Sequence, residues 1–108
     1  IPANSYVIDV DAVRDNAALL SGEAKKYHFK VFAMTKQIGR NPVVLRAIQE
    51  AGIESCVAVD MACARAIKAA GLTLGHLGHL VQVSKWETVA GVKLDPEYWT
   101  VFSREKAE

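Results

Sequence analysis

The chain has 108 residues, which is enough for one small domain. It is 51% hydrophobic and 23% charged, with a mean hydropathy of +0.11, so it is apolar enough to form a core and is not a disordered tail. Its 13 Lys and Arg residues nearly balance its 12 Asp and Glu residues, which predicts no nucleic-acid partner. Its apolar runs are far shorter than the roughly 18–20 residues of a membrane span, which predicts no membrane partner.

Five β-rich runs alternate with helical segments along the chain. The runs are nearly continuous in apolar residues, which is typical of parallel strands that helices cover. They span residues 6–8, 31–34, 56–59, 74–83 and 98–102. This alternation predicts an α/β fold.

Helix starts and stops are also visible in the sequence. We expect Asp11, Asn41 (followed by Pro42), Asp60 and Ser103 to cap helices, because short polar side chains bind the free N–H groups of a first turn. The apolar stripe of the first helix would be Val13, Ala17, Leu20, Ala24 and Tyr27. Gly52, Gly71 and Gly91 are expected to end three of the helices.

Ligands in parallel α/β folds bind at the carboxyl ends of the strands, which draws attention to Lys36. It directly follows the run 31–34 and Thr35, where partial desolvation would favour a free, nucleophilic amine. The following turn leads to a helix N-terminus that attracts anions, and Arg40 adds a positive charge there. An aldehyde cofactor that carries a phosphate needs both features; the alternative interpretation is an ordinary surface lysine in a loop.

The remaining candidates are histidines, cysteines and tryptophans. His76 and His79 would point to opposite faces of a strand, so we predict no metal site, and His79 is the better candidate for a ligand contact. Two cysteines are too few for a disulfide framework, and Cys56 and Cys63 indicate core positions in a reducing cytoplasm. Trp86 and Trp99 are expected to be packing residues.

Three carboxylates suggest a different class of protein. Asp9, Asp11 and Asp60 lie at strand ends, where they would hold Mg²⁺ in a phospho-receiver-like switch domain of the flavodoxin type. Against this alternative, Ser103 stands where a receiver needs a lysine after its fifth strand. Asp11 and Asp60 also have a simpler interpretation as helix caps, and an inert structural module is a third possibility.

Several segments in order resemble the N-terminal domain of the alanine racemase family. They are residues 6–16 (YVIDVDAVRDN), 31–36 (VFAMTK) and 57–72 (VAVDMACARAIKAAGL), while 34–42 (MTKQIGRNP) and 78–82 (GHLVQ) resemble a distinct branch of that family. The resemblance covers roughly residues 5–103.

The resemblance implies an enzyme of fold type III that depends on pyridoxal 5'-phosphate. The fold would be a (β/α)8 TIM barrel, with residues 1–108 forming the N-terminal part of the cofactor-binding domain: a leading strand outside the barrel, then four βα units, with Trp99 on the fourth barrel strand. The C-terminal half of the barrel and any second domain would lie outside this chain. We also expect the chain to be a fragment because it begins at Ile1 and has excess apolar residues, which would equally suit a homodimer.

On this resemblance, Lys36 would hold the cofactor as a Schiff base and act as an acid/base in an amino-acid racemase or epimerase, that is, an isomerase acting on a small amino-acid substrate. Lys36, Arg40 and His79 are the predicted cofactor-binding residues, and no metal is predicted. Arg40 stands where the family has a Tyr that contacts the phosphate, and Cys63 replaces a common Glu. A cofactor carrier with the same fold is the alternative without catalysis.

Overall fold

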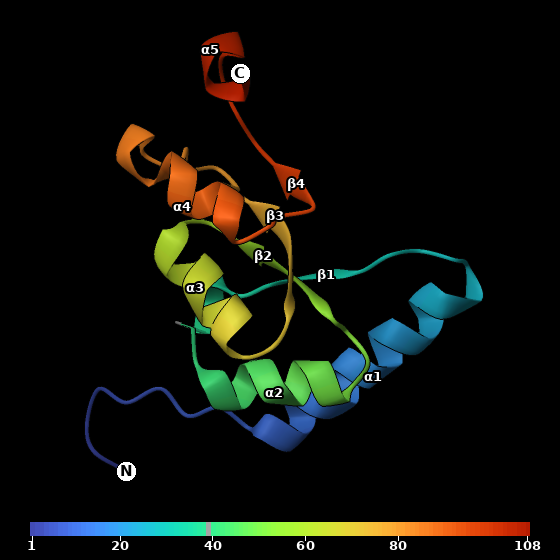
Figure 1. The fold of residues 1–108 in the computed structure, drawn as a ribbon. Coiled ribbons are helices and arrows are strands. Elements are labelled where there is room, and N and C mark those ends of the chain that lie inside the picture. The colour runs from blue at the N-terminus through green and yellow to red at the C-terminus, as the bar shows by residue number, and fades with distance from the viewer. Residues whose placement is uncertain (39) are drawn as a thin grey trace.

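The computed structural model describes residues 1–38 and 40–108, and it shows alternating helices and strands (Figure 1). The helices are α1 (Val10–Lys26), α2 (Pro42–Glu50), α3 (Met61–Ala69), α4 (Thr88–Lys93) and α5 (Arg104–Ala107). The strands are β1 (Phe32–Met34), β2 (Ser55–Ala58), β3 (Thr73–Leu77) and β4 (Tyr98–Trp99). Two 3-10 turns, η1 (Lys36–Ile38) and η2 (Lys85–Glu87), follow β1 and precede α4.

The four strands form one parallel sheet in the order β1-β2-β3-β4. Because crossovers between parallel strands are right-handed, consecutive strand order places the connecting helices on the same face of the sheet. The core lies between that face and the helices, and its fully buried members include Leu45, Ile67, Leu74 and Leu77. The α/β alternation expected from the sequence is therefore present.

The opposite face of the sheet bears Phe32 and Tyr98, whose ring centroids are 6.0 Å apart. Tyr98 is 62% exposed. A register shift between Cys56 and Val57 pairs Val57 with His76, so Gly75 has no partner on β2. A Cβ atom at Gly75 would lie 2.6 Å from the Phe32 ring, which explains the glycine at this bulge.

The prediction of a half-barrel is wrong. The structure is a small α/β domain whose four-stranded sheet is open, with β1 and β4 at its two edges. Residues 6–8, the expected leading strand, are not a strand, and Tyr6 is 99% exposed. The other strands are also shorter than expected: β3 ends at Leu77 and β4 has two residues.

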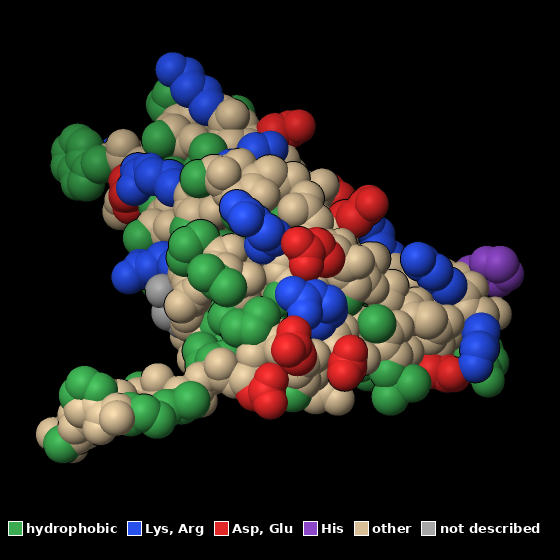
Figure 2. Space-filling model, turned by 90° about the horizontal axis from the view of Figure 1, so that it is seen from below, with side chains coloured by type: hydrophobic (Ala, Val, Ile, Leu, Met, Phe, Trp, Pro, Cys, Tyr) green, Lys and Arg blue, Asp and Glu red, His purple; other side chains and the backbone are tan. Residues whose placement is uncertain are grey.

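The apolar run 6–8 belongs to an N-terminal arm that extends away from the domain (Figures 1 and 2). Figure 2 shows this arm at the left, with hydrophobic side chains along it. A β-rich run becomes a strand only when a neighbouring strand supplies hydrogen bonds, and no described strand of this chain pairs with it. Local composition predicted a strand here, and the absence of a partner explains the difference.

Most of the predicted helix ends are confirmed. Asn41, Asp60 and Ser103 cap α2, α3 and α5 through their side chains. The cap of α1 is Asp9 and not Asp11: Asp9 Oδ1 accepts a hydrogen bond from Ala12 N at 3.0 Å, whereas Asp11 lies inside the helix. The expected stripe of α1 is also partly wrong, because Leu20 is 60% exposed. Gly52 and Gly71 follow the ends of α2 and α3 as predicted.

Gly91 lies inside α4 and does not end it. It is buried against Trp99, and a Cβ atom added at Gly91 would lie 2.6 Å from the indole ring. This close approach requires a glycine, because the ring occupies the space of the missing side chain.

We expect Gly91→Ala to destabilise the domain by about 1–3 kcal/mol, because displacement of Trp99 outweighs the gain of up to about 1 kcal/mol in helix propensity. Gly22→Ala is the matched control: Gly22 lies in α1, and no atom lies within 4 Å of the position that a Cβ would take there, so this change should be stabilising. Urea unfolding of both variants measures the difference, and equal stabilities would contradict the packing argument.

Candidate functional site

Lys36 lies at the carboxyl edge of the sheet, immediately after a buried residue. Thr35 is 1% exposed, and its hydroxyl donates a hydrogen bond to the carbonyl oxygen of Val57 on β2 at 3.3 Å. Lys36 itself is exposed and begins the turn η1, which a hydrogen bond from Ile38 N to Thr35 O (3.2 Å) closes. The backbone at Lys36 is thus anchored to the sheet while its side chain is accessible.

Arg40 contacts a different part of the molecule. Together with Arg46 it lines a hollow of about 380 Å³ between α2 and α3. Its charge helps to hold the pKa of Asp60 below its usual range, although the main cause is a hydrogen bond of 2.8 Å that the carboxylate accepts from Cys63 N. Gly39, which joins η1 to Arg40, lies outside the described residues.

The N-terminus of α2 does not offer free amide donors to an anion. Asn41 Oδ1 accepts hydrogen bonds from Val43 N at 2.9 Å and from Val44 N at 3.4 Å. The side chain of Asn41 therefore occupies the position that an anion would take at a helix start. An anion near this turn would depend on the guanidinium of Arg40.

His76 and His79 lie together, contrary to the prediction that they point to opposite faces. Their ring centroids are 5.8 Å apart, with the rings nearly perpendicular. The prediction assumed a continuous strand, but β3 ends at Leu77, and Gly78 adopts a φ of +84° that turns the chain. This turn brings His79 back beside His76.

Thr100 is the third member of this cluster. His76 Nε2 and Thr100 Oγ1 are 2.6 Å apart, which joins β3 to the residue after β4. Partial burial lowers the pKa of His76, and the positive charge of His79 lowers it further. Sequence reasoning assigned no role to Thr100, which lies inside the predicted run 98–102, or to Thr35, whose position directly after the run 31–34 was the available signal.

The carboxylates that suggested a receiver domain have structural partners. Asp9 caps α1, Asp11 forms an ion pair with Arg14 (2.6 Å), and Asp60 caps α3. Among residues 1–38 and 40–108, no group of three His, Cys, Asp or Glu side chains is arranged to hold a metal ion. Nothing in this geometry favours the receiver alternative.

The two cysteines are buried and free, as core residues should be. Burial raises the pKa of the Cys56 thiol to about 11, and it also raises the pKa of Cys63. A raised pKa favours the protonated thiol at neutral pH, which is the less reactive form. Trp99 packs against the core as expected, whereas Trp86 is 91% exposed, so its predicted packing role is wrong.

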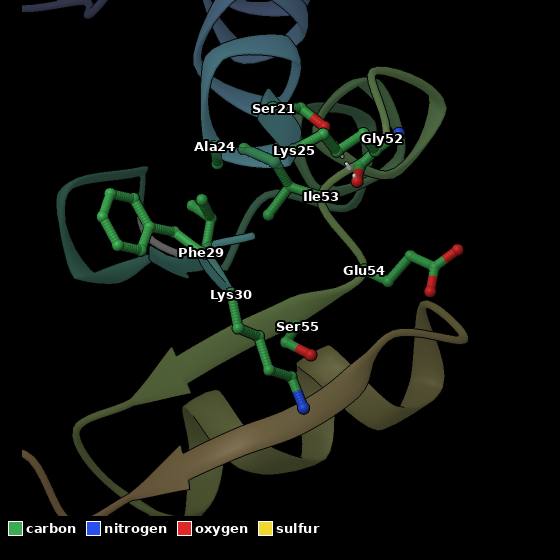
Figure 3. A pocket seen from close by; sticks show the side chains of 10 residues that line it. Ser21, Ala24, Lys25, Phe29, Lys30, Gly52, Ile53, Glu54 and Ser55 are labelled. Atoms are coloured by element: carbon green, nitrogen blue, oxygen red, sulfur yellow. Dashed lines mark hydrogen bonds between the residues drawn. The ribbon is translucent and has the colours of Figure 1, made fainter. Parts of the chain in front are cut away.

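A second hollow, of about 170 Å³, lies at the opposite end of the sheet (Figure 3). It is bounded by the C-terminal part of α1, the segment before β1, and residues 52–55. Ser21, which lines it, donates a hydrogen bond to the carbonyl oxygen of Gly52 at 3.2 Å, drawn as a dashed line in Figure 3. Gly52 follows the C-terminal end of α2, which carries negative partial charge, and the amine of Lys25 lies close enough to complement this charge. The polar side chains of this hollow therefore have a structural role.

The two lowered pKa values predict that acid destabilises the domain. The unfolded chain binds a proton at His76 and Asp60 more readily than the folded one, so the free energy of unfolding should fall as the pH drops below about 6.5 and again below about 4. Urea unfolding across this range measures the effect. His76→Gln should flatten the first part of the profile and Asp60→Asn the second, while a wild-type stability that does not change between about pH 7 and pH 5 would contradict the argument for His76.

Within the part of the chain that the structure describes, no helix has both the length and the apolar character needed to cross a membrane. No protein-family model matches the chain. It is 38% identical over 107 residues to the uncharacterized protein YhfX of Escherichia coli (strain K12). That alignment covers 99% of this chain and 28% of YhfX, so the chain spans little more than a quarter of the length of this relative.

Proposed function

We propose that this chain belongs to a pyridoxal 5'-phosphate-dependent enzyme that acts on amino acids as a racemase or epimerase, with Lys36 as the residue that binds the cofactor covalently. The observation that carries the proposal is the position of Lys36, which is exposed at the carboxyl edge of a parallel sheet and anchored through buried Thr35. Ligands of parallel α/β proteins bind at this edge. The resemblance of residues 31–36 to the cofactor-lysine strand of alanine racemases supports the same assignment.

The residues at this edge fit the chemistry of the cofactor. Lys36 provides an accessible amine for the aldehyde, and His79 provides a ring that can contact the pyridine. Arg40 follows this edge and lines the hollow between α2 and α3; its guanidinium would bind the phosphate, since Asn41 already caps α2. When bound, the cofactor supplies an electron sink for a carbanion at the amino-acid Cα.

Lys36 would have two roles. Its Nζ would hold the cofactor covalently through the aldehyde group, and when an amino-acid substrate takes its place there, the same amine would accept the Cα proton and return it. A cytoplasmic location and assembly into a homodimer are also part of the proposal; the exposed apolar side chains, such as Trp86 at 91%, would suit contacts with another copy.

Selective labelling tests the proposal. The protein is incubated with a stoichiometric amount of pyridoxal 5'-phosphate, reduced with borohydride and digested, and the modified lysines are identified by mass spectrometry. We expect the label at Lys36 in clear excess over the exposed Lys68 and Lys85. Equal labelling of the three would contradict the assignment, and labelling of Lys36 without any exchange of Cα protons would favour a cofactor carrier.

A further inference from the structure

The paired imidazoles of His76 and His79 form a cluster of side chains at the carboxyl edge, of which the proposed function uses only His79, as a contact to the cofactor ring. The two rings meet edge to face with centroids 5.8 Å apart. His76 Nε2 is held 2.6 Å from Thr100 Oγ1, so one ring of the pair is fixed across the β3–β4 boundary. Both histidines are only partly exposed.

We propose that this pair supplies the second acid/base of the reaction, with His79 as the group that exchanges a proton with the substrate Cα and His76 as a positioning residue held by Thr100. This inference rests on the proposed function. In the step, the Cα–H bond breaks, its electron pair stays on the substrate, and the proton moves to the neutral imidazole of His79. Return of a proton from the imidazolium to Cα restores the starting charge, so no other reactant is needed.

The distance across the sheet suits two groups on either side of a small substrate. Lys36 follows β1 and His79 follows β3, and these strands are separated by β2. Adjacent strands lie roughly 4.7–4.9 Å apart, so the two strand ends are separated by about 9.5 Å. The long side chain of Lys36 and the imidazole of His79 would reach a small substrate from the two sides of this gap.

Charge and burial in the cluster disfavour a proton on His76. Burial lowers the pKa of His76, and the charge of His79 lowers it further. On β4, Thr100 binds His76, and Tyr98 is opposite His76 in the sheet. His76 therefore suits a positioning role in its neutral form, and the exchanged proton would be carried by His79.

Two measurements on the full protein test this inference. The first is an NMR titration of the histidine rings without cofactor, in wild type and in Thr100→Val; the chain has only three histidines, and exposed His28 is the internal control. We expect His76 and His79 to titrate as a coupled pair, and the valine to change the tautomer and titration of His76 while His28 stays unchanged.

The second measurement follows deuterium incorporation at the Cα of a set of amino acids in D₂O, with pyridoxal 5'-phosphate present. His79→Gln should slow the exchange by about 100-fold or more. His76→Gln and Thr100→Val should slow it less and shift its pH profile, because they act through His79. His28→Gln should exchange at the wild-type rate, and Lys36 should be labelled in every variant.

The outcomes separate the two proposals. If wild-type protein shows no preferential label at Lys36, the proposed function fails and the acid/base role of the pair fails with it. If Lys36 is labelled but His79→Gln exchanges Cα protons at the wild-type rate, the inference fails and the proposed function stands. Independent titration of His76 and His79, with no effect of Thr100→Val, would overturn the pairing whatever the cofactor does.

Discussion

Lys36→Ala is expected to abolish the borohydride-stable label that pyridoxal 5'-phosphate leaves on the wild-type protein, apart from a low background on other lysines. The methyl group of alanine cannot form a bond to the aldehyde carbon, and among the described residues no other lysine lies within two residues after the end of a strand. Intact-mass spectrometry after reduction measures the fraction labelled.

The matched control is Lys85→Ala, which removes an exposed lysine from the turn η2. This variant should keep the full label. Both variants should match the stability of the wild type in urea within about 0.5 kcal/mol, because substitutions of exposed side chains have small effects on stability. A Lys36→Ala protein that labels as strongly as wild type would refute the assignment of this residue.

Leu45→Ala is expected to lower the free energy of unfolding by about 2–5 kcal/mol. Leu45 is 1% exposed and belongs to the core between α2 and the sheet, so its truncation removes apolar contacts and leaves a cavity. The total stability of a domain is about 5–15 kcal/mol, so this loss is a large fraction of it.

Leu19→Ala provides the same chemical change at a surface position. Leu19 lies in α1 and is 67% exposed, so its truncation should change stability by no more than about 0.5 kcal/mol. Chemical denaturation of the two variants tests whether the core is where the structure places it. Equal destabilisation by both changes would contradict the assignment of Leu45 to the core.

Local signals predicted much of the secondary structure. Asn41, Asp60 and Ser103 cap helices as expected because a cap is a contact over two or three residues, and the neighbouring sequence specifies it. The same locality explains two errors. Asp9 and Asp11 are both suitable N-caps by residue type, and only the observed start of α1 at Val10 shows that Asp9 is the cap. Gly91 resembles a residue that ends a helix, and only its contact with Trp99 explains why it lies within α4.

The candidate site was also predicted only in part from the sequence. The sequence alone identified Lys36 and His79 as residues of interest, because Lys36 comes just after the apolar run 31–34 and His79 lies near the end of the run 74–83. It could not predict that Thr35 is anchored to Val57, or that His76 meets both His79 and Thr100, since these contacts depend on strand order and on the turn at Gly78.

By itself, the sequence determined the α/β alternation, most helix ends and the burial of both cysteines, all of which follow from short-range patterns of polarity and backbone preference. Only the tertiary structure decided that the sheet is open with four strands, that residues 6–8 form an exposed arm, and that two histidines three residues apart face each other. The physical reason is that strand pairing and side-chain clustering are contacts between distant parts of the chain. A run of apolar residues specifies that a segment prefers burial, but not which partner will bury it.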